Sequence, residues 1–258
     1  MKIPDSAQWI QCVRLNLSTL GYHYEPELSL AVKHCEPVIS AAKLLGRLYI
    51  PAGSDPHRPV IDTQPSSSAP RWRPFDRRSL IGWHNDFSTK QTRPELSLSW
   101  IEREDPEGPD KGTWLVASTA AVLAKLRQSR EGEKLVTELS QHAEPFGYRD
   151  VGGWRSFRVI IRANPKLRQE GIRFYGRALE NGAWLRFGRV SARTREIVAR
   201  IEEAANSVRE VLPAKTGSLL IVHNNLSLHD RSAQTVRGPK ENRRRAILCF
   251  VDKLHRPL

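Results

Sequence analysis

The chain has 258 residues, of which 39% are hydrophobic and 27% are charged, so it can bury a substantial core as one large domain or two small ones. Its three cysteines, Cys12, Cys35 and Cys249, form no CxxC pair, which argues against a disulfide framework or a zinc–cysteine site. No apolar run approaches about 18 residues and the N-terminus has no signal pattern, so we expect a cytoplasmic protein without a membrane span.

The first 46 residues are predicted to be helical. Asp5 or Ser6 is a suitable N-cap for a helix that stops near Gly21. This helix carries an apolar stripe at helical spacing, formed by Trp9, Ile10, Val13 and Leu17. A second helix is expected over residues 27–45, immediately before the next glycine of the chain.

From residue 47 onward the composition is mainly of the β type, with inserted helices. Apolar runs and a threonine-containing segment predict strands around Thr113 and at residues 47–50, 79–83, 95–101, 156–162, 171–177, 217–222 and 246–251. Helices are predicted at 119–127, 133–142 and 194–212, and the apolar stripe of the last one indicates packing. The sequence shows no internal repeat and no break between domains. We interpret 1–258 as one domain, with a helical part at 1–46 and a core at 47–258.

His84, Asn85 and Asp86 place two metal-ligating side chains in one short segment. On an extended segment residues i and i+2 point to the same side, so His84 and Asp86 can bind one ion while Asn85 points away. We expect the third ligand to be His229, which follows the apolar run at 217–222. Two histidines and one carboxylate form the facial triad that holds iron(II) with open coordination positions.

A His-x-Asp triplet alone is a weak signal in a chain with eight histidines. His23 and Glu25 have ligand-like spacing too, but they lie in a predicted helix-to-loop stretch without other support. The triad gains support from Arg244, which opens the strand at 246–251 and can hold a carboxylate through paired hydrogen bonds if it faces the metal.

Three motifs follow one another in an order that can be compared with known proteins. Residues 217–231 end in Leu-His-x-Arg, residues 112–118 begin with Gly-Thr-Trp, and an arginine lies 15 residues after His229. Together they resemble the taurine dioxygenase and clavaminate synthase group of Fe(II)/2-oxoglutarate oxygenases. In this resemblance His229 is the distal iron ligand, Thr113 helps to bind the co-substrate, and Arg244 matches the co-substrate arginine.

The resemblance implies a mainly β fold with flanking α-helices, built on a double-stranded β-helix (jelly roll) with the metal in the mouth of the barrel. It implies that Fe(2+) is held by His84, Asp86 and His229. It also implies that the distal carboxylate of 2-oxoglutarate is bound by Thr113 and Arg244, and that O2 is consumed. The stretch at 64–74, which is rich in proline and serine, lies where this family places an active-site loop or lid.

Several residues leave alternatives open. Arg243 and Arg245 are interpreted as solvated strand ends, although a register slip of one residue would exchange them with Arg244. Arg231 is expected either to brace the cavity wall through a salt bridge or to contact substrate. His223 is a second candidate metal ligand near His229. Leu248 occupies the position where family members that act on sulfonates have a second arginine, which argues against a taurine-like mode of binding.

The expected reaction is hydroxylation or desaturation of an unactivated C–H bond of a small molecule, such as an amino-acid derivative or natural-product intermediate, with release of succinate and CO2. The carboxylate of Asp86 argues against halogenation. The net charge of +13 is compatible with an anionic or carrier-bound substrate, with 2-oxoglutarate itself as the attracted anion, or with a genome-level preference for arginine. The dispersal of the basic residues argues against nucleic acid. The alternatives are a non-catalytic basic binding module on a jelly roll and a zinc hydrolase with the same ligands.

Overall fold

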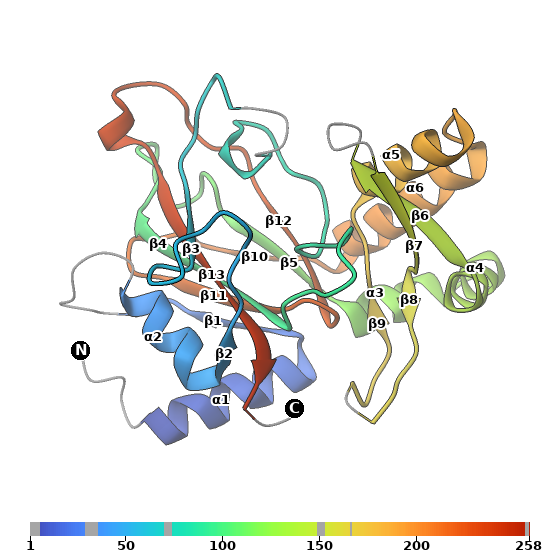
Figure 1. Cartoon of the computed structure of the whole chain (residues 1–258), viewed down its shortest axis with the longest axis horizontal. Helices are drawn as coiled ribbons and strands as arrows, with labels where there is room; N and C mark the ends of the chain where they lie inside the picture. The colour runs from blue at the N-terminus through green and yellow to red at the C-terminus, as the bar shows by residue number, and fades with distance from the viewer. Residues whose placement is uncertain (1–5, 29–35, 70–73, 149–152, 166, 256–257) are drawn as a thin grey trace.

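Two antiparallel sheets form the centre of the computed structural model, which describes residues 6–28, 36–69, 74–148, 153–165, 167–255 and 258 (Figure 1). The larger sheet has the order β1 (Tyr22–Glu25), β11 (Leu219–His223), β4 (Leu96–Arg103), β13 (Arg245–Leu254) and β2 (Gly46–Leu48), and β3 (Val60–Thr63) also pairs with β13. The smaller sheet has the order β10 (Glu210–Leu212), β5 (Trp114–Ser118) and β12 (Ser227–Arg231). The mainly β fold with a double-stranded β-helix core is thereby confirmed.

The alternation of side chains along β11 explains how the larger sheet has two buried faces. Leu219 and Ile221 pack into a cluster with α1 (Ser6–Thr19) and α2 (Glu36–Leu45), which cover the outer face. Leu220 and Val222 point the other way and join Trp114 of the smaller sheet. Since successive residues of a strand face opposite sides, one apolar strand serves both layers.

Four helices lie on the side of the smaller sheet. They are α3 (Thr119–Leu126), α4 (Arg130–Gln141), α5 (Gly176–Phe187) and α6 (Ala192–Val208), on the right of Figure 1. Helices α3 and α6 pack on β5, and α4 and α5 pack on these helices and on the hairpins described below. Ala117 of β5 and Leu228 of β12 belong to the same buried cluster as the apolar stripe of α6. Two short hairpins complete this side, β6 (Ala143–Tyr148) with β7 (Gly153–Arg158) and β8 (Ile160–Ile161) with β9 (Gly171–Ile172). No helix among the described residues has the length and hydropathy needed to cross a membrane.

Some predicted elements are wrong in extent or type. In the predicted helix at 27–45, residues 29–35 lie outside the described part and helix α2 begins only at Glu36. The stretch at 22–25 is a strand rather than a helix-to-loop segment, because it pairs with β11. Residues 79–83 do not form a strand. The strand expected at 171–177 stops at Ile172, and the helix expected at 194–212 is α6, after which β10 begins.

The loop expected at 64–74 has no regular strand or helix up to residue 69, and residues 70–73 lie outside the described part. It ends in a short 3-10 helix, η1 (Pro74–Asp76). Asp76 is buried and accepts a hydrogen bond from the backbone N–H of Gln64 at 2.9 Å. This contact joins the two ends of the loop.

Candidate metal centre

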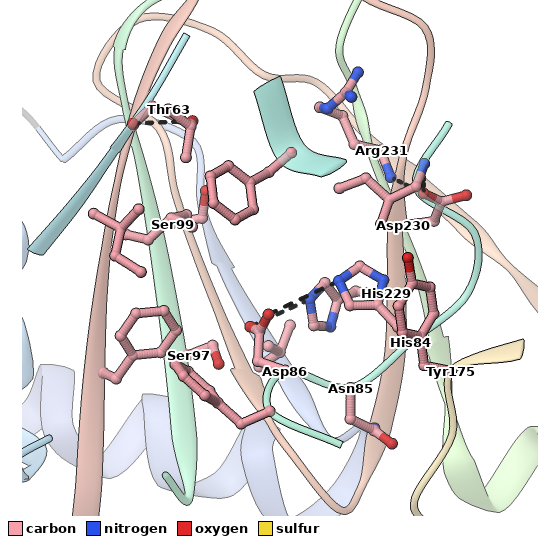
Figure 2. A pocket seen from close by; sticks show the side chains of 18 of the residues that line it. Thr63, His84, Asn85, Asp86, Ser97, Ser99, Tyr175, His229, Asp230 and Arg231 are labelled. Carbon is pink, nitrogen blue, oxygen red and sulfur yellow. Dashed lines mark hydrogen bonds and ion pairs between the residues drawn. The ribbon is translucent and has the colours of Figure 1, made fainter. Parts of the chain in front are cut away.

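The three predicted ligands meet at one point of the mouth of the barrel. His229 is the central residue of β12, and its backbone exchanges two hydrogen bonds of 3.0 Å with His84. The Asp86 carboxylate lies 3.8 Å from Nε2 of His84 and 3.5 Å from Nε2 of His229. The three ligand atoms lie within 4.8 Å of one another, and Figure 2 shows both imidazoles directed at the carboxylate.

Asn85 points away from this cluster, as expected, and holds the segment in place. Its side-chain amide donates to the backbone carbonyl of Ser227 at 2.7 Å, and its carbonyl oxygen accepts from the backbone N–H of Phe174 at 2.7 Å. The backbone N–H of Asp86 donates to Oδ1 of Asn224 at 3.1 Å. These buried bonds fix His84 and Asp86 by their backbones, so their side chains remain available to a metal.

Asp230 is a functional residue that sequence reasoning did not identify. Its Oδ1 accepts backbone N–H groups from Ile81 at 3.0 Å, Gly82 at 3.1 Å and Arg231 at 2.7 Å. These bonds replace the ladder that a strand at 79–83 would have made, which explains why that segment is irregular. Its place between His229 and Arg231 was the only signal in the sequence.

The protonation of the cluster suits a divalent cation. Burial, together with the nearby His229, lowers the pKa of His84 to about 4. Nδ1 of His84 lies 2.8 Å from the carbonyl of Gly82, which favours the tautomer that leaves a lone pair on Nε2. Burial would raise the pKa of Asp86, but His229 and His84 outweigh it and hold this pKa below its usual range. Two imidazoles and a carboxylate at this spacing fit iron(II).

The metal cluster lines a cavity of about 530 Å³. Apolar and aromatic side chains form one part of its wall, including Trp114, Leu220, Val222, Leu248 and Phe250, and polar or charged side chains form the rest. Phe87 and Phe250 pack edge to face with 5.1 Å between ring centroids. A dry wall around a metal site strengthens electrostatic interactions inside it and protects reactive species from water.

Of the three consecutive arginines at 243–245, Arg244 is the one that lines this cavity. It shares the lining with Ala246, Leu248 and Phe250, which follow at intervals of two residues along β13. Its side chain is only 3% exposed, and its Nε has no hydrogen-bond partner among the described residues. Burial, followed by the charge of Arg231, lowers the pKa of Arg244 to about 9, although Asp105 opposes this shift. Such a buried cation favours an anionic ligand.

The neighbours of Arg244 are held elsewhere. Arg243 donates to the carbonyls of Gly238 and Pro65, and Arg245 forms ion pairs with Glu102 at 2.6 Å and Asp62 at 3.5 Å. They are therefore partnered strand-end residues, more tightly held than the solvated ends that we expected.

Thr113 lies directly before β5 and does not belong to the cavity lining. Its hydroxyl donates to Oγ of Ser232 at 2.8 Å, and Oγ of Ser232 also accepts its backbone N–H at 3.0 Å. The predicted contact of Thr113 with 2-oxoglutarate stays a prediction, since it requires this hydroxyl to turn toward the cavity.

Gly112 supports the side chain of Arg244. A Cβ at this position would lie 2.7 Å from Cδ and 2.8 Å from Nε of Arg244, and the φ of Gly112 is +64°. We expect Gly112→Ala to displace the guanidinium and to raise the 2-oxoglutarate concentration needed for half-maximal succinate release. Gly188→Ala is the matched control, because Gly188 has a φ of +69° and open space around its Cβ position. Equal 2-oxoglutarate requirements in the two variants would contradict this role for Gly112.

His223, the second candidate ligand, lies outside the cavity lining. Its Nδ1 accepts the backbone N–H of Asn225 at 3.2 Å, and burial, together with Arg93, lowers the pKa of His223 to about 4. We expect His223→Ala to keep its iron. His229→Ala should lose iron affinity by more than about 100-fold, because removing even an outer partner of a ligand costs about 10- to 100-fold. Iron content after anaerobic gel filtration measures both; iron loss from His223→Ala alone would reverse the assignment.

Arg231 braces the wall, but through carbonyl groups rather than a salt bridge. Its guanidinium donates to the backbone carbonyls of Arg77 at 2.8 Å, Ser79 at 3.0 Å and Ser232 at 2.5 Å. These bonds tie β12 to the segment that leads to His84. In Figure 2 the side chain of Arg231 lies beside Asp230 and away from the metal cluster.

A jelly roll with two histidines, one carboxylate and a buried arginine in its mouth defines the class of Fe(II)- and 2-oxoglutarate-dependent dioxygenases. The sequence model of the family described as "Taurine catabolism dioxygenase TauD, TfdA family" matches residues 32–249. The chain belongs to this family and is an Fe(II)/2-oxoglutarate-dependent dioxygenase, with Fe(II), 2-oxoglutarate and O2 as its cofactors and co-substrates. The predicted family is thus confirmed.

Several solved structures share the fold. Asparagine oxygenase in complex with Fe(II), 2S,3S-3-hydroxyasparagine and succinate has a TM-score of 0.70 at 17% identity, covering 95% of this chain and 78% of that chain. PvcB from Pseudomonas aeruginosa has a TM-score of 0.65 at 18% identity, covering 97% and 80%. The non-heme iron oxygenase OrfP with Fe, succinate and (3S)-hydroxy-L-Arg has a TM-score of 0.65 at 13% identity, covering 95% and 79%. No curated protein matches the chain by sequence.

Proposed function

We propose that His84, Asp86 and His229 hold the iron(II) and that Arg244 binds the distal carboxylate of 2-oxoglutarate. The single observation that carries this proposal is the convergence of the three ligand atoms on the same cavity that contains the buried guanidinium of Arg244. Thr113 is proposed as a second contact for that carboxylate. All of these groups belong to one oxygenase domain.

The reaction that we propose is oxidation of an unactivated C–H bond of a small molecule, by hydroxylation or desaturation. Iron(II) bound at the triad supplies activation of O2 coupled to the oxidative decarboxylation of 2-oxoglutarate to succinate and CO2. The protein positions the two organic molecules and keeps water away. Asp86 occupies the position that a halogenase would leave to a halide, so we propose hydroxylation or desaturation rather than halogenation.

An amino-acid derivative is the substrate class that we propose. Asparagine oxygenase and OrfP are described with hydroxylated asparagine and arginine, and the cavity of about 530 Å³ suits a ligand of this size. The net charge of +13 favours delivery of an anionic substrate, free or carrier-bound, and a cytoplasmic location is proposed with it.

The test is direct. Anaerobic addition of Fe(II) and 2-oxoglutarate should give a weak visible charge-transfer band, and aerobic incubation with candidate amino-acid derivatives should release succinate. Absence of both signals would refute the proposal. A zinc hydrolase would instead retain zinc and show no dependence on 2-oxoglutarate.

A further inference from the structure

The cavity lining contains more cationic side chains than the proposed metal centre and the binding of 2-oxoglutarate require. Its lining includes five cationic and two acidic side chains, namely Arg77, Lys90, Arg177, Arg231, Arg244, Asp86 and Asp230. The two carboxylates serve the triad and three backbone N–H groups, as described above. Arg231 is engaged by backbone carbonyls, and Arg244 is assigned to 2-oxoglutarate. Arg77, Arg177 and Lys90 remain without a role in the proposed reaction.

Two of these cations, Arg77 and Arg177, line the same cavity as Tyr175, which lies next to the metal centre. The ring of Tyr175 is 5% exposed and lies 5.5 Å from the ring of His84, between centroids. Its hydroxyl shares a hydrogen bond with Arg177. Burial and the carboxylate of Asp230 raise the pKa of Tyr175, and the charges of Arg177 and Arg77 lower it. All four side chains line the same cavity. Figure 2 shows Tyr175 beside the two histidines, with its hydroxyl on the side of Asp230.

Within the part of the chain that the structure describes, the ion pairs involve arginines other than Arg77 and Arg177. Asp230 lines the cavity too, but its Oδ1 accepts three backbone N–H groups. Burial raises the pKa of Glu202, and this effect outweighs the charge of Arg177, which lowers it. Two guanidinium groups and a phenol hydroxyl that line one cavity can offer several donors to a carboxylate, a group that arginine binds through paired hydrogen bonds.

The wall formed by β13 offers no alternative cation beyond Arg244. Ala246, Leu248 and Phe250 continue the cavity lining from that residue, and all three are apolar. An anionic group of the substrate that approached this wall would lose its hydration without gaining a partner. The part of the lining that includes Arg77, Tyr175 and Arg177 offers donors that can hold it.

We propose that Arg77, Arg177 and Tyr175 form the anion-binding subsite for the primary substrate, and that this substrate is a carboxylate. The inference rests on the proposed function, because it takes the metal centre and Arg244 to be occupied by iron and 2-oxoglutarate. The carboxylate is anchored beside His84, and the remainder of the molecule lies against the apolar wall. Asn181, one turn after Arg177 on α5, also lines the cavity and is a neutral contact for the same ligand.

Matched pairs of probes test the subsite with the full chain. Phenylpropanoate and hexanoate are compared with their primary amides, which have nearly the same shape and no charge. Binding is measured by anaerobic calorimetry in saturating Fe(II) and 2-oxoglutarate, so that Arg244 is already occupied. Wild-type protein should bind at least one acid about 10-fold or more tightly than its amide, since charge-assisted hydrogen bonds exceed neutral ones by about that factor.

Variants identify the residues responsible. Arg77→Ala and Arg177→Ala should each reduce the preference for the acid, and the double variant should bind acid and amide equally. Tyr175→Phe should reduce it less. Arg186→Ala is the matched control on α5, because Arg186 lies over the rings of Trp154 and Phe187 and outside the cavity lining. This variant should keep the wild-type preference.

Three results would overturn the inference: no preference for the acid in wild-type protein, no binding of any probe, or a preference that survives in the double variant. The charge-transfer band, recorded before any probe is added, tests the proposed function separately. A normal charge-transfer band without tighter binding of the acid would refute only the proposed carboxylate subsite. A missing band would remove the proposed iron and 2-oxoglutarate chemistry, while calorimetry would still report whether the arginines select an anion.

Discussion

Asp86→Ala should abolish succinate release and lower iron affinity by at least about 100-fold, with the fold retained. The expected loss is large because loss of an outer partner of a metal ligand already costs about 10- to 100-fold, and Asp86 is the only carboxylate among the three clustered groups. Its side chain contacts the two histidines, whereas the segment is held by Asn85 and by the backbone N–H of Asp86. Removing the carboxylate therefore leaves the supporting bonds in place.

Iron content, succinate release and thermal unfolding of the iron-free protein distinguish a ligand from a structural residue. Asp62→Ala is the control: Asp62 is a partly exposed partner of Arg58 and Arg245 outside the cavity lining. It should retain iron and activity. If Asp86→Ala instead unfolds at a much lower temperature than both wild-type protein and Asp62→Ala, the carboxylate has a structural role and the metal assignment is wrong.

Part of the candidate metal centre could be predicted from local rules, whereas the roles proposed for Thr113, His229 and Arg244 came from the family resemblance. The i and i+2 relation placed His84 and Asp86 on one side and Asn85 on the other. Side chains alternate along β13, so only one of two neighbouring arginines can face the cavity. The sequence did not show whether that residue is Arg244 or one of its neighbours, because the pairing register of the strand was unknown. Hydrogen bonds between β13 and β4 settle it, since Ala246 pairs with Ile101 across a local irregularity after Arg245.

Long-range contacts determine the parts that could not be predicted. Helix α5 contains Gly176 and Gly182, which lower helix propensity. Gly182 is nevertheless required, because a Cβ there would lie 2.2 Å from the carbonyl oxygen of Pro145. Strand β1 likewise forms because it pairs with β11, not because of its composition. Since α5 carries Arg177, missing this helix also concealed the anion-binding subsite.

The cavity therefore has two cationic regions with different surroundings. Arg244 is buried, packs against Gly112 and has no ion pair among the described residues. Arg177 is exposed at the start of α5. This arrangement predicts that substitutions at the two arginines affect different ligands.

Arg244→Ala should raise the dissociation constant of 2-oxoglutarate by about 10- to 150-fold, because hydrogen bonds to a charged group contribute about 1.5–3 kcal/mol. Arg243→Ala and Arg245→Ala should leave this constant near the wild-type value, since their partners lie outside the cavity. The dissociation constant is measured from the anaerobic charge-transfer band as 2-oxoglutarate is added. A larger effect in either control than in Arg244→Ala would mean that the wrong arginine has been assigned.

Thermal unfolding gives a second test of whether Arg244 binds 2-oxoglutarate. The folded-state pKa of Arg244, about 9, lies below its usual value, so the unfolded chain binds this proton more tightly. The buried charge therefore disfavours the folded state at neutral pH, where arginine stays protonated. Arg244→Ala removes the cost, so the ligand-free variant should fold. What it should lose is the rise in Tm that 2-oxoglutarate gives wild-type protein. An undiminished rise would show that the carboxylate binds elsewhere.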